Sequence, residues 1–144
     1  MSNPLPTIPR LTIPLEVYYF DTDAGGVVHN IAYLRMVEIA RSQLAASLGW
    51  TLEEMGRTGL VPVVARTEID YLTPARLGDH LIVTAELIRM EKIRFLIRFE
   101  IASADKPDLI FIRCIQTMVT VQLPGGRPQR VPKAWADAYP QLIA

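Results

Sequence analysis

The sequence predicts an α+β fold in which one antiparallel β-sheet wraps around one long central helix. Three observations lead to this fold class. The 144 residues suit one domain, which we expect to span residues 1–144, and are too few for two ordinary domains. One long apolar segment with helical spacing lies in the first third of the chain. Four long β-type segments follow it, and the turns between them leave no room for crossover helices.

The beginning of the chain predicts an arm and a first strand. Residues 1–10 contain three prolines and no continuous apolar stretch, so we expect a loose N-terminal arm. The β-branched and aromatic segment at residues 15–20 predicts the first strand. This strand ends at residues 21–26, Asp-Thr-Asp-Ala-Gly-Gly, where turn-forming residues cluster.

Residues 30–48 predict the central helix. Apolar residues recur there at three- or four-residue spacing: Tyr33, Val37, Ala40, Leu44 and Leu48. Other apolar side chains widen this surface far beyond one stripe, which is typical of a helix that is wrapped on most sides. Gly49 ends the helix. A capping box at residues 51–54 then begins a short second helix, which ends at Gly56 or Gly59.

The rest of the chain predicts strands joined by turns. The candidate strands are Val61–Leu72, His80–Met90, Ile93–Ser103 and Leu109–Leu123. Their spacing favours antiparallel hairpins. Residues 132–142 predict one or two further helical turns. By this pattern the sheet buries its concave face on the helix. Most aromatic side chains of the strands are expected in the core, although those on the other strand face could line an acyl pocket; they are Tyr18, Tyr19, Tyr71, Phe95 and Phe99.

The composition limits the possible partners. Half of the residues are hydrophobic and 21% are charged, which suits a packed globular core. The mean hydropathy of +0.21 indicates a deep core or an apolar surface buried against a partner subunit. Fifteen basic and fifteen acidic residues leave no basic excess, so we expect neither nucleic acid nor an anionic membrane as a partner.

Cysteine and histidine are too few for several kinds of site. The single cysteine, Cys114, excludes an intramolecular disulfide and a cysteine-rich zinc site. Only His29 and His80 supply imidazoles, so we expect no metal. No apolar run reaches the length of a membrane span, and residues 1–10 do not form a secretory signal. A cytoplasmic location is therefore the expectation.

The segment at residues 18–30 is the most informative for chemistry. Asp21 and Asp23 lie two residues apart where the first strand ends, and two glycines then let the backbone approach a ligand closely. A helix begins near Asn30, and its first N–H groups have no intrahelical partner. These N–H groups can hold a developing oxyanion while a carboxylate attacks the carbonyl or activates water. Alternatively, Asp21 and Asp23 simply bind backbone N–H groups in the loop.

This segment resembles the signature of a known family. The matching residues are Asp21-Thr22-Asp23-Ala24-Gly25-Gly26-Val27-Val28, Tyr33 and Glu38-Ile39-Ala40-Arg41. They resemble hot-dog fold acyl-CoA thioesterases of the 4-hydroxybenzoyl-CoA thioesterase-like family, in the branch with the Tol-Pal-cluster and 1,4-dihydroxy-2-naphthoyl-CoA thioesterases. The resemblance covers nearly the whole chain, because a strand, a helix and four strands is the hot-dog order.

The resemblance implies roles for individual residues. Asp23 falls on the catalytic carboxylate, a nucleophile or general base, and the backbone N–H of Asn30 falls on the donor to the thioester carbonyl. Asp21 falls on a position that is more often structural, and Tyr33 is expected to contact the substrate. This chain has His29-Asn30 where Tol-Pal-type members usually carry Tyr-His. His29 therefore either orients the substrate or is a helix-edge histidine that bonds to a backbone carbonyl.

Glu38 is the second candidate carboxylate, since other hot-dog thioesterases use a glutamate on the central helix. The spacing of Arg35, Glu38 and Arg41 favours a structural alternative, an ion-pair strip along the helix.

Basic residues in the second half of the chain suit coenzyme A. Residues 85–135 hold nine basic and five acidic residues. Arginine and lysine at a pocket mouth suit the phosphates of the nucleotide. By resemblance we expect Lys92, Arg94 and Arg130 to bind it; the alternative is that they are ordinary solvated charges.

The resulting hypothesis is an acyl-CoA thioesterase with no cofactor, since coenzyme A is part of the substrate. The acyl group is aromatic, such as 1,4-dihydroxy-2-naphthoyl, or short to medium in length. By resemblance the protein is a homodimer or a dimer-of-dimers tetramer. Two alternatives remain: a hot-dog dehydratase or hydratase that uses His29 and Glu38, and a non-enzymatic acyl-binding module.

Overall fold

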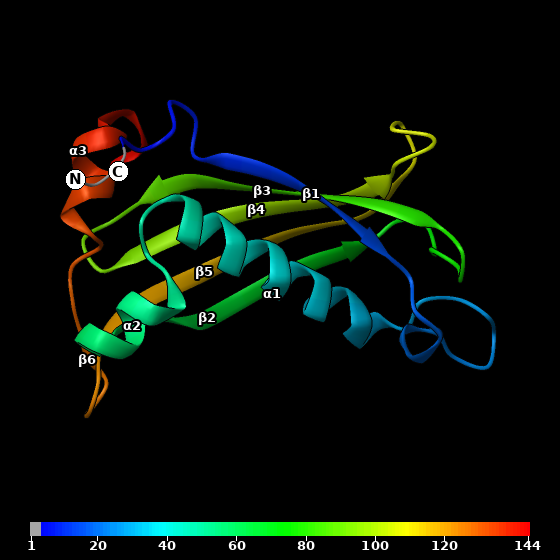
Figure 1. The fold of residues 1–144 in the computed structure, drawn as a ribbon, viewed down its shortest axis with the longest axis horizontal. Coiled ribbons are helices and arrows are strands. Elements are labelled where there is room, and N and C mark those ends of the chain that lie inside the picture. The colour runs from blue at the N-terminus through cyan, green and yellow to red at the C-terminus, as the bar shows by residue number, and fades with distance from the viewer. Residues whose placement is uncertain (1–3) are drawn as a thin grey trace.

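The computed structural model describes residues 4–144 and contains one antiparallel sheet with one long helix, α1, lying across it (Figure 1). The strands are β1 (Arg10–Glu16), β2 (Leu60–Tyr71), β3 (His80–Met90), β4 (Arg94–Ser103), β5 (Ile110–Gln122) and β6 (Arg127–Pro128). The helices are α1 (Asn30–Ser47), α2 (Leu52–Thr58) and α3 (Lys133–Ala138), with 3₁₀ turns at Tyr19–Asp21 and Pro140–Leu142. The strand order is β1-β3-β4-β5-β2, and β6 pairs with β5. The predicted α+β fold is confirmed.

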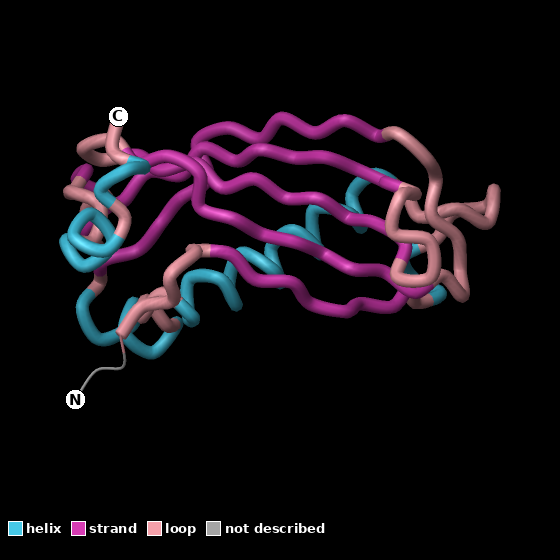
Figure 2. The backbone as a smooth tube through the Cα atoms, turned by 90° about the horizontal axis from the view of Figure 1, so that it is seen from above, coloured by secondary structure: helices cyan, strands magenta, loops and turns pink. Residues whose placement is uncertain are grey.

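The core lies between α1 and the concave face of the sheet (Figure 2). Alternate residues of β3 and β4 point into it, because side chains alternate between the two faces of a strand. The fully buried side chains from the two strands and α1 include Leu81, Val83, Leu87, Phe95, Phe99, Ile101, Met36, Val37 and Ala40. This packing fixes the position of α1 over the sheet.

One chain does not cover α1 as completely as its sequence predicts. Ile31 is 66% exposed, and Leu34 is also exposed. The edge strand β2 exposes Val63 and Val64 as well. The expectation that the helix is wrapped on most sides is therefore wrong for the single chain, since one side of α1 and the neighbouring sheet edge stay open.

The first strand lies earlier in the chain than its sequence predicts. Residues 10–16 form β1, whereas residues 19–21 form a 3₁₀ turn and the rings of Tyr18, Tyr19 and Phe20 are exposed. β1 is an edge strand, where a proline such as Pro14 is tolerated because it need not donate to a neighbour. The prediction of a strand at residues 15–20 is therefore correct for Leu15 and Glu16 and wrong for residues 17–20.

The described part of the N-terminal arm is anchored. The Tyr139 hydroxyl donates a hydrogen bond to the Pro6 carbonyl at 2.6 Å, and the Leu87 N–H donates to the Pro9 carbonyl at 2.9 Å. Leu5 packs against the core. Residues 4–9 are thus held by β3 and the C-terminal segment, in contrast to the expected loose arm; residues 1–3 of that arm lie outside the described residues.

The connection from β2 to β3 is not a hairpin. β2 pairs with β5 at one edge of the sheet, whereas β3 lies between β1 and β4. The connection, residues 72–79, passes the N-terminal end of α1, where the Val28 N–H donates to the Ala75 carbonyl at 2.8 Å. This crossing brings residues distant in sequence to the beginning of α1. The boundaries of β2, β3, β4 and β5 agree with the prediction within one residue, whereas the short strand β6 was not predicted.

Candidate active site

The loop at residues 21–29 forms a small hairpin that leads directly into α1. At its base the His29 N–H donates to the Asp21 carbonyl at 2.9 Å, and Thr22 pairs with Val28. Nearer its tip the Asp23 N–H donates to the Val27 carbonyl, also at 2.9 Å. Gly26 has a φ of +74°, a conformation that favours glycine, and its N–H closes the turn on the Asp23 carbonyl. Gly26 thus lets the chain reverse within four residues.

Asp23 lies at the tip of this hairpin and is exposed. Its Oδ1 accepts the Gly25 N–H at 2.8 Å. Within residues 4–144, its Oδ2 has no hydrogen-bond partner. One oxygen therefore fixes the carboxylate against the backbone, and the other is available to attack a carbonyl or to take a proton from water.

Asp21 has a contrasting environment. It is only 1% exposed, and its carboxylate accepts the Tyr18 N–H at 2.9 Å. Arg35 Nη2 donates to both carboxylate oxygens, at 2.7 and 2.8 Å. Both carboxylate oxygens are therefore buried and occupied, and neither is free to contact a substrate. Arg35 therefore pairs with Asp21 and does not join the ion-pair strip with Glu38 that its spacing predicts.

His29 is the N-cap of α1. Its Nδ1 accepts the Ala32 N–H at 3.1 Å, so the ring is a hydrogen-bond acceptor at this atom. The expectation that His29 bonds to a backbone carbonyl is wrong, because an uncapped helix N-terminus offers donors and not acceptors. The imidazole takes over the capping role that a serine, threonine, aspartate or asparagine usually fills.

The first N–H groups of α1 are the next feature of the candidate site. The N–H groups of Asn30 and Ile31 have no hydrogen-bond partner among the described residues. They carry the positive end of the helix dipole, and α1 is 18 residues long. Two free N–H groups at the beginning of a long helix can hold the oxygen of a polarised carbonyl.

A cleft of about 210 Å³ opens beside these groups. Its lining residues are Val28, Asn30, Tyr33, Tyr71, Leu72, Thr73 and Pro74. Tyr33 is buried, its hydroxyl accepts the Ala75 N–H at 3.0 Å, and its burial is the main cause that raises its pKa above the ordinary value. The Tyr33 ring thus forms part of the wall of the cleft, and its hydroxyl stays protonated at neutral pH.

Tyr71 lines the cleft, which agrees with the alternative that a strand aromatic faces a pocket and not the core. It is half exposed, its ring lies 5.8 Å from that of Tyr33, and its hydroxyl donates to the Asn30 carbonyl at 3.3 Å. It lies at the end of β2, so only the pairing of β2 with β5 places it beside α1. No local signal in the sequence indicates this position.

The basic residues lie elsewhere in the chain. Lys92 and Arg130 line a larger cleft, of about 990 Å³, between the β3–β4 turn and α3. Figure 1 shows this region at the opposite end of α1 from residues 21–29. An α-helix of 18 residues is about 27 Å long. A single chain therefore does not bring Lys92 or Arg130 to Asp23, and Arg94, at the exposed start of β4, does not line either cleft.

Glu38 is held in a polar network on α1. Arg41 donates to Glu38 Oε1 at 2.8 Å and to Gln116 Oε1 at 2.7 Å, and Gln116 donates to Thr67 at 3.2 Å. The predicted pairing of Glu38 with Arg41 is confirmed. The network ties α1 to β5 and β2, which is a structural use of these charges.

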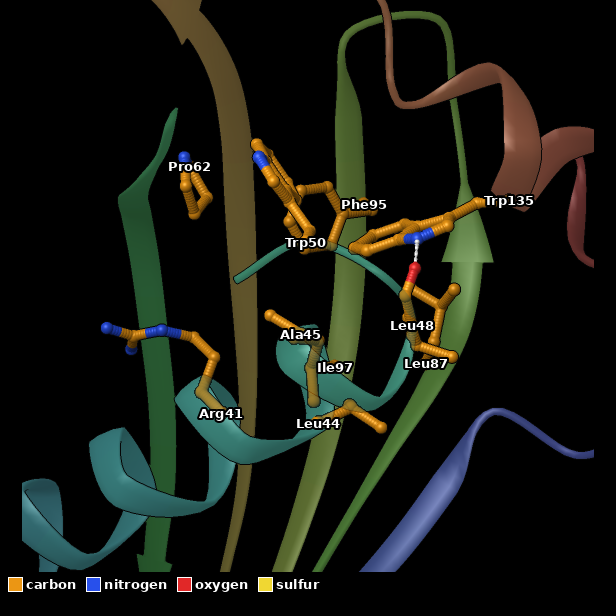
Figure 3. Close-up of a pocket in the computed structure, with 10 residues that line it drawn as sticks. All are labelled: Arg41, Leu44, Ala45, Leu48, Trp50, Pro62, Leu87, Phe95, Ile97 and Trp135. Carbon is orange, nitrogen blue, oxygen red and sulfur yellow. Dashed lines mark hydrogen bonds between the residues drawn. The ribbon is translucent and has the colours of Figure 1, made fainter. Parts of the chain in front are cut away.

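Other candidate features are part of the core. Cys114 is buried, and desolvation raises the pKa of its thiol to about 11, so the side chain is a neutral core residue. A space of only about 10 Å³ lies at the C-terminal end of α1. Figure 3 shows the residues that line it, among them Trp50, Phe95 and Trp135. It is a packing gap, since it barely holds one water. In the described part of the chain, no three potential metal ligands gather at one place, and no helix is long and apolar enough to span a membrane.

The sequence of this chain is similar to those of known thioesterases. A model of the thioesterase-like superfamily matches residues 19–139. The acyl-CoA thioesterase YbgC of Haemophilus influenzae is 30% identical over 132 residues, which are 91% of this chain and 95% of the relative. A 1,4-dihydroxy-2-naphthoyl-CoA hydrolase of Synechocystis is also 30% identical, over 133 residues, with the same coverage of 91% and 95%.

Solved structures have the same fold. A 1,4-dihydroxy-2-naphthoyl-CoA thioesterase from Synechocystis superposes with a TM-score of 0.81 at 26% identity, over 92% of this chain and 97% of that one. A Staphylococcus aureus protein crystallised in complex with CoA superposes with a TM-score of 0.83 at 16% identity, over 92% and 83% of the two chains. The second likeness concerns the fold alone.

Proposed function

Because the chain belongs to the thioesterase-like superfamily, whose hot-dog fold it shares, we propose that it hydrolyses an acyl-CoA thioester to the free acid and coenzyme A, with Asp23 as the catalytic carboxylate. The observation that carries the proposal is the hairpin at residues 21–29. Its tip carries the Asp23 carboxylate, which has one free oxygen. Its second strand continues directly into α1, whose first N–H groups are free. Homologues of nearly the same length are named acyl-CoA thioester hydrolases, which supports the reaction class.

In the proposed reaction, the N–H of Asn30 donates to the thioester carbonyl oxygen and stabilises the negative charge that develops there. Asp23 Oδ2 either adds to the carbonyl carbon, to give an acyl anhydride that water then hydrolyses, or takes a proton from a water whose oxygen adds instead. In both routes the carbon–sulfur bond breaks, the acyl group becomes the free acid, and coenzyme A leaves as the thiolate and is protonated by solvent. His29 caps the helix that supplies the N–H groups.

For the acyl group we propose an aromatic ring system, with 1,4-dihydroxy-2-naphthoyl-CoA as the first substrate to test. The Synechocystis relatives carry this substrate in their names. The cleft beside Asn30 supports it, because the half-exposed ring of Tyr71 lines the cleft and offers a surface on which a planar group can pack. Short and medium acyl-CoA esters are the second class.

The nucleotide of coenzyme A is proposed to bind Lys92 and Arg130. These residues lie about the length of α1 away from Asp23 in the same chain, so a second copy must supply them to the site. The open side of α1 and the free edge of β2 are surfaces that a second copy can cover. We therefore propose a homo-oligomer whose site combines Asp23 of one subunit with the basic cleft of another.

A thiol-release screen tests the reaction. The protein is assayed with aliphatic, aromatic and hydroxyaryl CoA esters, and the appearance of free coenzyme A is followed. Release of the thiol from at least one ester is expected. Hydration of an enoyl-CoA without thiol release would instead favour the dehydratase alternative, and tight binding of CoA esters without any turnover would favour an acyl-binding module.

A further inference from the structure

The ion pair between Asp21 and Arg35 joins the hairpin to α1, and the reaction proposed above does not use it. The carboxylate of Asp21 is buried and accepts three hydrogen bonds, one from the Tyr18 N–H and two from Arg35 Nη2. The ring of Phe20 lies over the guanidinium, with 5.6 Å between the Arg35 Cζ and the ring centroid. The pair is shielded from water mainly at its Asp21 end, since the Asp21 side chain is 2% exposed and the Arg35 side chain 38% exposed.

Both ends of the hairpin are attached to the first two turns of α1. At one end, Asp21 binds Arg35 on the helix. At the other end, His29 caps the helix through Ala32, and its N–H donates to the Asp21 carbonyl. The hairpin is therefore fixed to the helix at two points. Asp23, two residues beyond the Asp21 anchor, is held relative to the helix N-terminus.

We infer that Asp21 and Arg35 are positioning residues for thioester hydrolysis. They hold the Asp23 carboxylate at the angle and distance from the Asn30 N–H at which the carbonyl carbon can be attacked. This inference rests on the proposed function and adds residues that touch neither substrate nor reacting atoms. Reaction rates are sensitive to such positioning, because a displacement of about 1 Å at a reacting group can cost on the order of 10²-fold in rate.

The kinetic test uses Arg35→Met and Arg35→Lys. Arg35→Met keeps the length and removes the charge, and is expected to lower kcat per folded molecule by at least about tenfold while KM changes little. Arg35→Lys keeps a donor that can contact both Asp21 oxygens and is expected to recover part of kcat; it also carries the test if Arg35→Met fails to fold. Arg57→Met, which breaks the exposed pair with Glu54 on α2, is the matched control with unchanged kinetics.

A double variant and amide exchange separate positioning from stability alone. In the Asp23→Asn background, Arg35→Met is expected to lower the residual rate much less than it does in the wild type, because the group it positions is gone. Amide hydrogens of the hairpin, such as those of Asp23 and His29, should exchange faster in Arg35→Met, while those of β3 to β5 keep their protection.

The outcomes distinguish this inference from the proposed function. Wild-type protein that releases no thiol, or an Asp23→Asn variant with full activity, would overturn the proposed function and the inference with it. Active wild type and impaired Asp23→Asn, together with Arg35→Met that retains wild-type kcat per folded molecule, would overturn the inference alone. Equal losses from Arg35→Met in the wild-type and Asp23→Asn backgrounds would also overturn it, since they indicate a general structural effect.

Discussion

At the scale of single residues, two aspartates two positions apart differ in burial and in what they bind. Asp21 is buried and fully occupied by Arg35 and the Tyr18 N–H, whereas Asp23 is exposed and keeps one oxygen free. The sequence left open that both aspartates simply bind backbone N–H groups in the loop. Both do bind such groups, but Asp23 does so with only one of its two oxygens. A carboxylate must have a free oxygen to act on a substrate, which favours Asp23.

The capping role of His29 leads to a stability prediction. His29→Ala removes the acceptor for the Ala32 N–H and is expected to lower the free energy of unfolding by about 1 kcal/mol. His29→Asn restores a good N-cap and is expected to keep both stability and thiol release. Thermal unfolding and the thiol-release rate are measured for both variants. Loss of activity in a fully stable His29→Asn protein would contradict a role limited to capping.

The buried thiol of Cys114 leads to a pH prediction. Its pKa is raised to about 11 in the folded chain, against about 8.5 for an unfolded cysteine. The folded state therefore holds this proton more tightly, and the contribution of the thiol to stability is fully present below about pH 8.5 and lost as the pH rises toward 11. At pH 8 a thiol reagent should label Cys114 only after denaturant is added. Rapid labelling of the native protein would contradict this and would also disturb a thiol-release assay.

At the scale of elements, local patterns predict those parts of the fold that depend on local contacts. The spacing of apolar residues predicts α1, and β-type segments bounded by turns predict β2, β3, β4 and β5 within one residue. The first strand was misplaced because aromatic residues at 18–20 favour a strand, whereas the Asp21 carboxylate binds the Tyr18 N–H and closes a turn there. The edge position of β1, which tolerates Pro14, is a property of the whole sheet and is not visible locally.

The candidate site also has a part that local sequence predicts and a part that depends on long-range contacts. The spacing of Asp21, Asp23 and the glycines indicates the hairpin and the helix that follows it. Tyr71 and the Asp21–Arg35 contact could not be predicted, because the first depends on the pairing of β2 with β5 and the second on how the hairpin folds back on α1. The large separation of Lys92 and Arg130 from Asp23 also depends on the long-range arrangement of the chain.

Two glycines in and after α2 lead to opposite predictions for the stability of their alanine variants. Gly59 has a φ of +74°, and a Cβ there would lie 2.6 Å from the Leu123 carbonyl oxygen. Gly59→Ala is therefore expected to destabilise the protein by more than about 1 kcal/mol. Gly56 lies within α2 with no atom within 4 Å of a Cβ, so Gly56→Ala is expected to stabilise it by up to about 1 kcal/mol. Denaturant unfolding compares the two, and equal effects would contradict the account of Gly59.

At the scale of the whole molecule, the shared site that we propose combines Asp23 of one subunit with Lys92 and Arg130 of another. Asp23→Asn lacks the carboxylate, and a Lys92→Ala, Arg130→Ala double variant lacks the basic cleft. In a co-expressed mixture, half of the dimers combine the two chains, and one of the two sites in each such dimer is intact. At substrate concentrations below KM, the mixture is therefore expected to recover about a quarter of wild-type activity.

The control is a mixture of the Asp23→Asn chain with a chain that carries Asp23→Asn, Lys92→Ala and Arg130→Ala. No site in this mixture has the Asp23 carboxylate, so the mixture should stay inactive. Sedimentation of the wild type at micromolar concentration should show an oligomer. A monomer, or a mixture no more active than its separate parts, would contradict the shared site.

The carboxylate of Asp23 is the centre of this account, and its replacement is the most direct test. Asp23→Asn keeps the size of the side chain and removes its charge, so thiol release from the best CoA ester should fall by roughly 10²–10⁴-fold while binding of the ester is largely retained. Asp105→Asn, at an exposed turn between β4 and β5, is the matched control and should behave like the wild type. Near wild-type turnover by Asp23→Asn would contradict the assignment of Asp23 as the catalytic group.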